Sequence, residues 1–167
     1  MKHFIPVILF SFFTTIGCAQ KAPGKNTAYI ELFGNGLISS INYERQLTNH
    51  PTLVIHVGIG TYITHDDKFK AYPTIPVGIN YLLKFNNRSM LDIGFGATWT
   101  KPEVKLYVIV DRKDGNYVNH HYINFVPSVG YRRHTSNNLM WRCSITPVIT
   151  HSIGVIPFFG FSFGKIF

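Results

Sequence analysis

The stretch SMLDIGFGATWT, residues 89–100, decides the fold class. Its residues alternate strictly: Leu91, Ile93, Phe95, Ala97 and Trp99 fall on one face, and Met90, Asp92, Gly94, Gly96 and Thr98 fall on the other. Successive residues of a strand point to opposite faces, so this period of two predicts a β-strand. Residues 73–84 and 157–167 repeat the pattern of a large apolar face opposite Gly, Ser, Asn or Thr. One architecture should therefore explain all three segments.

Working outward from this segment, the same reading finds strands along the rest of the chain and no helix after the first 26 residues. Turn-forming Gly, Asn, Ser and Pro residues separate the strands. The eight predicted strands are about 27–33, 37–47, 52–63, 73–84, 89–100, 121–133, 138–149 and 157–167. The chain is therefore predicted to be all-β.

Three β folds could use such strands. A soluble sandwich or a lipocalin-like barrel buries its apolar face and covers the other with charged residues. A membrane barrel turns the apolar face to lipid and packs small or polar groups inward. Glycine on the second face favours the membrane barrel, because a narrow lumen leaves room for only a few large side chains. We expect an eight-stranded antiparallel up-and-down transmembrane β-barrel.

The connections between the predicted strands alternate in length. Short turns follow the second, fourth and sixth strands, whereas the opposite end carries longer connections at 65–72, 101–120 and 150–156. This asymmetry is typical of outer-membrane barrels, whose turns face the periplasm and whose loops face outward. Gly34–Gly36 is a short exception, and 104–123 should prolong two strands as an outer hairpin.

The first residues, MKHFIPVILFSFFTTIGCAQ, read as a secretory signal. A positive start precedes an apolar run that is too short to span a membrane, and small residues follow at a cleavage spacing. We expect removal of residues 1–19 and a single barrel domain over 20–167. Lipidation of Cys18 is the alternative, and the one other cysteine, Cys143, cannot form an internal disulfide after cleavage.

Composition narrows the class of partner. The 167 residues carry a net charge of +8, which raises the question of nucleic acid. Lys and Arg never run longer than two residues, and no helix carries a basic stripe, so we expect no nucleic-acid partner. Charged residues make up only 14% of the chain, less than a soluble surface normally carries.

Several segments resemble the small eight-stranded outer-membrane β-barrel proteins of Gram-negative bacteria, the porin-like and OmpA-like barrels. They are 41–45 (INYER), 75–81 (IPVGINY), 127–132 (PSVGYR) and 159–167 (FGFSFGKIF). The resemblance implies an outer-membrane location, with outer-membrane lipids and the barrel assembly machinery as partners. Phe163 and Phe167 are similar to the terminal aromatic signal that this machinery reads, although Lys165 departs from the residue usual there.

Polar residues on the predicted inward face form one layer. Paired residues of an antiparallel hairpin have a constant sum, and centres placed in the turns pair Glu44 with His56, His56 with Asn80, and Asn80 with Asp92. Asp92 then faces Arg132, which faces Arg142. These six residues could line a selective pathway or form a salt-bridged plug. The plug is preferred because side chains fill an eight-stranded interior.

No enzymatic or cofactor site stands out. His120 and His121 are adjacent, so a regular strand would point them to opposite faces. His120 and Ser128 lie ~26 Å apart along a strand, too far for a nucleophile–base pair. Glu31, Glu44 and Asp92 are inward carboxylates without dyad spacing. We expect no catalytic residue, metal or cofactor.

Most of the positive charge falls near the periplasmic turns. Lys84, Arg88 and Arg133 lie there with few acidic neighbours, whereas charges in the outer connections nearly cancel. They are predicted to form a lipid-facing basic rim. The chain is then a non-enzymatic outer-membrane protein with a structural or loop-mediated role and an unassigned extracellular ligand. The alternatives are a passive small-solute channel and, less favoured, a lipid-modifying enzyme.

Overall fold

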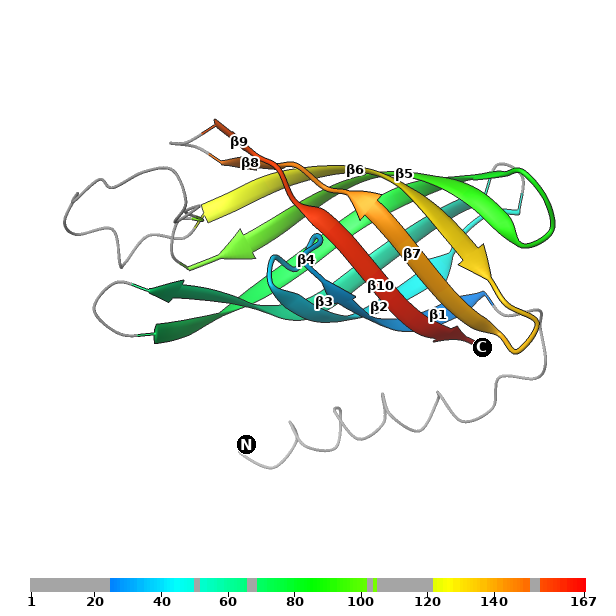
Figure 1. The fold of residues 1–167 in the computed structure, drawn as a ribbon, viewed down its shortest axis with the longest axis horizontal. Helices are drawn as coiled ribbons and strands as arrows, with labels where there is room; N and C mark the ends of the chain where they lie inside the picture. The colour runs from blue at the N-terminus through cyan, green and yellow to red at the C-terminus, as the bar shows by residue number, and fades with distance from the viewer. Residues whose placement is uncertain (1–24, 50–51, 66–68, 102–103, 105–121, 151–153) are drawn as a thin grey trace, which may run out of the picture.

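The computed structural model describes residues 25–49, 52–65, 69–101, 104, 122–150 and 154–167 (Figure 1). These residues form ten antiparallel strands: β1 (Asn26–Leu32), β2 (Ser39–Gln46), β3 (Thr52–His65), β4 (Phe69–Lys84), β5 (Ser89–Thr100), β6 (Tyr122–His134), β7 (Leu139–Ile145), β8 (Val148–Thr150), β9 (Gly154–Ile156) and β10 (Phe159–Ile166). Within these ranges no helix is long and apolar enough to cross a membrane.

The ten strands make one closed barrel with eight strand positions around its wall. We call each position a stave, because two of them consist of two consecutive strands. The sheet runs β5-β4-β3-β2-β1-β10-β7-β6, and β5 pairs with β6 to complete the circle. The seventh stave consists of β7 and β8, separated near Pro147, and the eighth consists of β9 and β10, separated near Pro157. Proline lacks the N–H that a ladder needs, which explains both interruptions. The predicted eight-stranded antiparallel barrel is confirmed.

The two ends of the barrel differ. We call the end where β1 begins and β10 ends the turn end; the backbones of Asn26 and Phe167 bond to each other there, at 2.8 and 3.1 Å. The opposite end is the loop end, towards which β3, β4, β5 and β6 extend (Figure 1). β3 and β4 there reach His65 and Phe69, so strand occupies most of the connection expected at 65–72. β9 likewise occupies 154–156, which was predicted to be loop.

Burial follows the alternation of the strands. Along the middle of β2 and β10, buried residues alternate with exposed ones. Large apolar residues are exposed on these and other strands, among them Ile41, Ile59, Ile93, Phe125 and Phe161. The apolar face therefore points out of the barrel and the face of small and polar residues points in.

The predicted registers are partly wrong. The structure pairs Glu44 with His56 and Arg132 with Arg142 as expected. His56 faces Gly78 instead of Asn80, and Asn80 faces Gly94 instead of Asp92. Asp92 and Arg132 face Gly130 and Met90 instead of each other. Each slip is two residues, which keeps every side chain on its face.

The slips have a steric cause. A β-carbon on Gly78 would lie 2.3 Å from His56 Nε2, and one on Gly94 would lie 2.5 Å from Asn80 Nδ2. At the slipped pairs, His56, Asn80 and Asp92 each lie across a glycine of the neighbouring strand, so no second side chain competes there for the same lumen volume.

We expect Gly58→Ala to lower the free energy of unfolding by ~1–3 kcal/mol through overpacking. Its β-carbon would lie 2.0 Å from Asn42 Oδ1 and 2.7 Å from the Ile41 carbonyl oxygen, which is backbone and cannot swing away. Gly96→Ala is the matched control, because its nearest atom is 2.8 Å away at the end of the Asn35 side chain. Urea titration in detergent micelles measures both, and an equal loss would contradict the steric account.

Candidate functional site: a polar network and an inserted turn in the lumen

Arg132 is the centre of the buried charge network. Its side chain is 1% exposed. Nη1 and Nη2 donate to Glu44 Oε1 and Oε2 at 2.5 and 2.7 Å, so the guanidinium binds this carboxylate with both nitrogens. Nε and Nη2 also lie 2.9 and 2.7 Å from Asp92 Oδ2. One arginine from β6 therefore joins carboxylates from β2 and β5 across the lumen.

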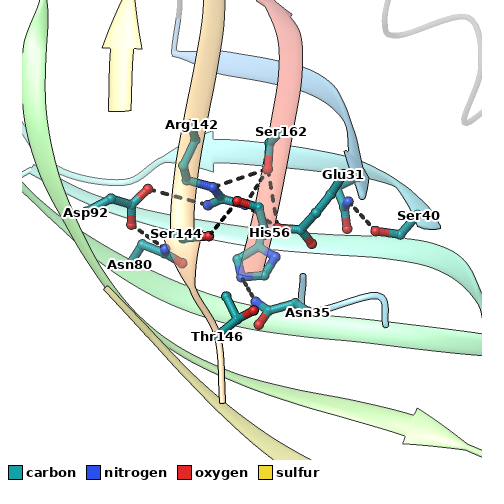
Figure 2. Close-up of polar contacts among 12 residues, drawn as sticks. Glu31, Asn35, Ser40, His56, Asn80, Asp92, Arg142, Ser144, Thr146 and Ser162 are labelled. Atoms are coloured by element: carbon teal, nitrogen blue, oxygen red, sulfur yellow. Dashed lines mark hydrogen bonds and ion pairs between the residues drawn. The ribbon is translucent and has the colours of Figure 1, made fainter. Parts of the chain in front are cut away.

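Arg142 extends the network towards the seam between β1 and β10 (Figure 2). Its Nη2 donates to Glu31 Oε1 at 2.7 Å, and Nη1 lies 3.4 Å from Asp92 Oδ2. Ser162 accepts from Arg142 and also lies 3.3 Å from Glu31 Oε1. The guanidinium carbon lies 5.1 Å from the centre of the Tyr29 ring, within cation–π range. Asp92 is therefore shared by both arginines.

Glu31 and Ser162 were missed as members of this layer. Alternation places Glu31 inward, but the pairing arithmetic ran from the second strand to the seventh. It did not pair the first strand with the last, although these two strands must be neighbours in a closed barrel. In the structure Glu31 faces Ser162 across that seam. Pairing the first strand with the last by the same arithmetic would have found both residues.

Asn80 and His56 have different roles. Asn80 Nδ2 donates to Asp92 Oδ1 at 2.5 Å, so Asn80 belongs to the charge network. His56 Nε2 lies 3.2 Å from Asn35 Nδ2, which donates to it. Asn35 is in the connection between β1 and β2. His56 therefore links the layer to a turn at the loop end of the lumen.

This connection, residues 33–38, folds into the barrel. The β1–β2 hairpin ends part-way along the barrel while β3 to β6 continue (Figure 1). Thr98 and Thr74 donate to the carbonyl oxygens of Asn35 and Gly36 at 2.5 and 3.1 Å. Asn35 and Leu37 are both buried. We name residues 33–38 the inserted turn; it was predicted only as a short turn.

Apolar clusters lie on both sides of the polar network. Towards the loop end, Leu37 of the inserted turn packs with Tyr62, Val104, Val126, Val148 and Ile156. Towards the turn end are two smaller clusters. They consist of Tyr29, Met140 and Ile166, and of Val54, Leu82 and Met90. Buried side chains therefore lie at three successive levels of the lumen.

The other predicted residues lie outside the lumen. Lys84, Arg88 and Arg133 are exposed at the turn end, where Arg133 pairs with Ser89 and the His134 amide donates to the Arg88 carbonyl at 2.8 Å. Phe163 and Phe167 are exposed on β10 and beyond it. The signal segment 1–19, Cys18, the His120–His121 pair and residues 105–121 of the expected outer hairpin lie outside the described residues. Among the residues that are described, no three His, Cys, Asp or Glu side chains are grouped to hold a metal ion.

Comparison with known proteins supports the architecture. No family model matches the chain, and no curated protein sequence matches it. Among solved structures, the chain is similar to the Yersinia pestis outer membrane protein Ail in a phospholipid bilayer nanodisc, with a TM-score of 0.53 and 11% sequence identity. The match covers 86% of this chain and 99% of Ail. At this identity the likeness concerns the fold, an antiparallel β-barrel.

Proposed function

We propose that this protein is an outer-membrane barrel with a closed lumen, which acts as a membrane-embedded scaffold for its loops and does not conduct solutes. The observation that supports the proposal is the set of buried side chains inside the barrel. The inserted turn, the charge network and three apolar clusters occupy the lumen at successive levels. The likeness to Ail, a protein solved in a bilayer, agrees with a membrane setting.

The outer surface supports the membrane location. Large apolar side chains are exposed on every stave, with Ile59 of β3 reaching 72% exposure. A soluble protein rarely exposes a continuous apolar surface, whereas lipid requires one. Closure of the sheet also satisfies the backbone groups that hydrocarbon cannot. In this proposal Phe163 and Phe167 serve the assembly machinery from the lipid-facing side.

The charge network favours a plug over a selective pathway. A pathway needs charged groups that contact water and passing solutes. Here Arg132 pairs with Glu44 and Asp92, and Arg142 pairs with Glu31 and Asp92. These charged groups therefore bind each other and not a passing solute. Such pairing of opposite charges is how a protein tolerates charge away from water. The network therefore cross-links the staves from inside.

The arrangement also argues against a lipid-modifying enzyme. A serine nucleophile needs a base within hydrogen-bond reach. In the described part of the chain, Ser162 bonds with Arg142 and Glu31, and Ser144 is 3.5 Å from the Gly160 carbonyl oxygen. His56 meets Asn35 and no serine. We therefore assign no catalytic residue.

Planar-bilayer recording tests this proposal against a channel. Protein extracted by detergent from the outer-membrane fraction should insert and give no stable open-channel steps, while a porin in the same bilayer supplies the positive control. Insertion is verified separately by protease protection in vesicles. Large, stable currents would overturn the closed lumen, and recovery of folded protein from the soluble fraction would overturn the membrane location.

A further inference from the structure

Aromatic side chains encircle the outer surface near the turn end. The Tyr43 hydroxyl donates to Asn26 Oδ1 at 2.7 Å, and the Tyr131 hydroxyl donates to Ser89 Oγ at 2.8 Å. Asn26 and Ser89 are the first residues of β1 and β5, so both hydroxyls point towards the turn end. The set, which we name the girdle, is Tyr43, Tyr81, Phe85, Tyr131, Trp141, Phe163 and Phe167. Tyr and Trp rings prefer the level of lipid headgroups.

Cationic side chains lie at or just beyond the girdle. Arg45 and Arg133 each follow a girdle tyrosine by two residues, and Lys165 lies between two girdle phenylalanines. Lys84 and Arg88 flank the turn that contains Phe85. All five side chains are exposed. With Arg45 and Lys165 added to the three residues predicted from the sequence, we name them the basic rim.

No side-chain carboxylate of the described residues neutralises this rim. The side-chain carboxylates there are Glu31, Glu44 and Asp92, and all three are buried in ion pairs or hydrogen bonds of the lumen. At the loop end, by contrast, Lys70 and Lys101 lie close in sequence to Asp66, Asp67 and Glu103. Among the described residues, the exposed cations at the turn end therefore have no exposed side-chain carboxylate near them.

We propose that the basic rim binds the phosphodiester groups of anionic lipids in the leaflet at the turn end, and so fixes the depth of the barrel in the membrane. Long Lys and Arg side chains can lay their stems along an apolar surface and extend their charges to headgroups. The girdle places these charges at the headgroup level, which favours a lipid phosphate over a free one. This inference rests on the proposed membrane location.

The protein contains two tryptophans, one near each end, which makes the proposal testable. Trp141 of β7 belongs to the girdle and lies 5.4 Å from the Tyr131 ring. Trp99 of β5 lies next to the last residue of that strand, at the loop end. Trp99→Phe leaves a reporter at the rim, and Trp141→Phe leaves a reporter at the opposite end. Both reporters are read in vesicles that mix phosphatidylglycerol with phosphatidylcholine, with one lipid brominated at a time.

We expect brominated phosphatidylglycerol to quench Trp141 with an apparent association constant about fivefold above that of brominated phosphatidylcholine, equivalent to ~1 kcal/mol. At Trp99 the ratio should be close to one. The rim variant Lys84→Gln/Arg88→Gln/Arg133→Gln should bring the Trp141 ratio towards one. The control variant Lys70→Gln/Lys101→Gln should leave it unchanged.

The outcomes separate the possible failures. Equal quenching of Trp141 by both lipids, or an unchanged ratio in the rim variant, would overturn the lipid-binding rim but leave the membrane barrel intact. Loss of the preference on adding inorganic phosphate, at matched ionic strength, would assign the rim to free phosphate instead. If neither brominated lipid quenches either tryptophan, the membrane location itself fails.

Discussion

Replacing Arg132 with methionine is expected to lower the free energy of unfolding by ~3–5 kcal/mol, the usual cost of removing one partner of a buried ion pair. Methionine fills much of the space of the arginine stem but donates no hydrogen bond. Glu44 would lose the two nitrogens that bind its oxygens, and Asp92 would keep only Arg142 and Asn80. The negative charges of Glu44 and Asp92 would then keep fewer hydrogen bonds and opposite charges, although both residues are buried.

The neighbouring residue supplies the matched control. Arg133 has the same side chain, one position along the same strand, but points outward and is exposed. Arg133→Met should change stability by no more than ~0.5 kcal/mol, as surface substitutions usually do. Both variants are unfolded with urea in neutral detergent, which removes any contribution from anionic lipid. Equal losses in the two variants would show that the lumen pairs do not stabilise the barrel.

A double-mutant cycle isolates the pair. Glu44→Gln removes the other charge, so Arg132→Met/Glu44→Gln should be more stable than the sum of the single losses predicts. Residues that share hydrogen bonds typically couple by ~0.5–3 kcal/mol. Additive losses would instead indicate that Arg132 acts through packing alone.

The sequence predicted the architecture because the physical signal for it is local. Alternation in 89–100 and 73–84 assigns each side chain to lipid or lumen without knowledge of its neighbours. A register slip of two residues preserves that assignment. The inward placement of Glu44, His56, Asn80, Asp92, Arg132 and Arg142 therefore did not depend on correct pairing.

Contacts between distant staves were less accessible to sequence reasoning. The pairing arithmetic placed each hairpin centre within a plausible turn and took no account of side-chain volume, whereas the structure sets His56 opposite Gly78. The space available to a lumen side chain depends on the side chains of all eight staves, so the sequence of one hairpin does not show which residues fit opposite each other. The seam between β1 and β10 joins residues more than a hundred positions apart, which hid the contact of Glu31 with Arg142.

The inserted turn was also beyond sequence reasoning, because its position depends on groups from three other staves. Thr74, Thr98 and Thr146 donate to its carbonyl oxygens, and none is near it in the chain. Its backbone is unusual as well. Phe33 and Leu37 have φ angles of 54° and 73°, a left-handed conformation that residues other than glycine rarely adopt. Lumen contacts must therefore offset a local strain of ~1–3 kcal/mol per residue.

The second large effect is expected at Leu37, and it tests whether those contacts hold the inserted turn in the lumen. Leu37 is 0% exposed and belongs to the apolar cluster at the loop end. Leu37→Ala should lower the free energy of unfolding by ~2–5 kcal/mol, as for other buried leucines. The matched control is Leu47→Ala, since Leu47 follows β2 at the turn end and is 51% exposed.

Backbone strain and side-chain burial can be separated at the same position. Leu37→Gly removes the same contacts as Leu37→Ala but relieves the left-handed conformation, so it should be ~1 kcal/mol more stable than the alanine variant. In both variants the inserted turn should become open to cleavage by a protease added to the detergent-solubilised protein, while the wild-type turn stays intact. If Leu37→Ala is as stable and as resistant to cleavage as Leu47→Ala, side-chain burial does not hold the turn, and the threonine hydrogen bonds alone keep it in place.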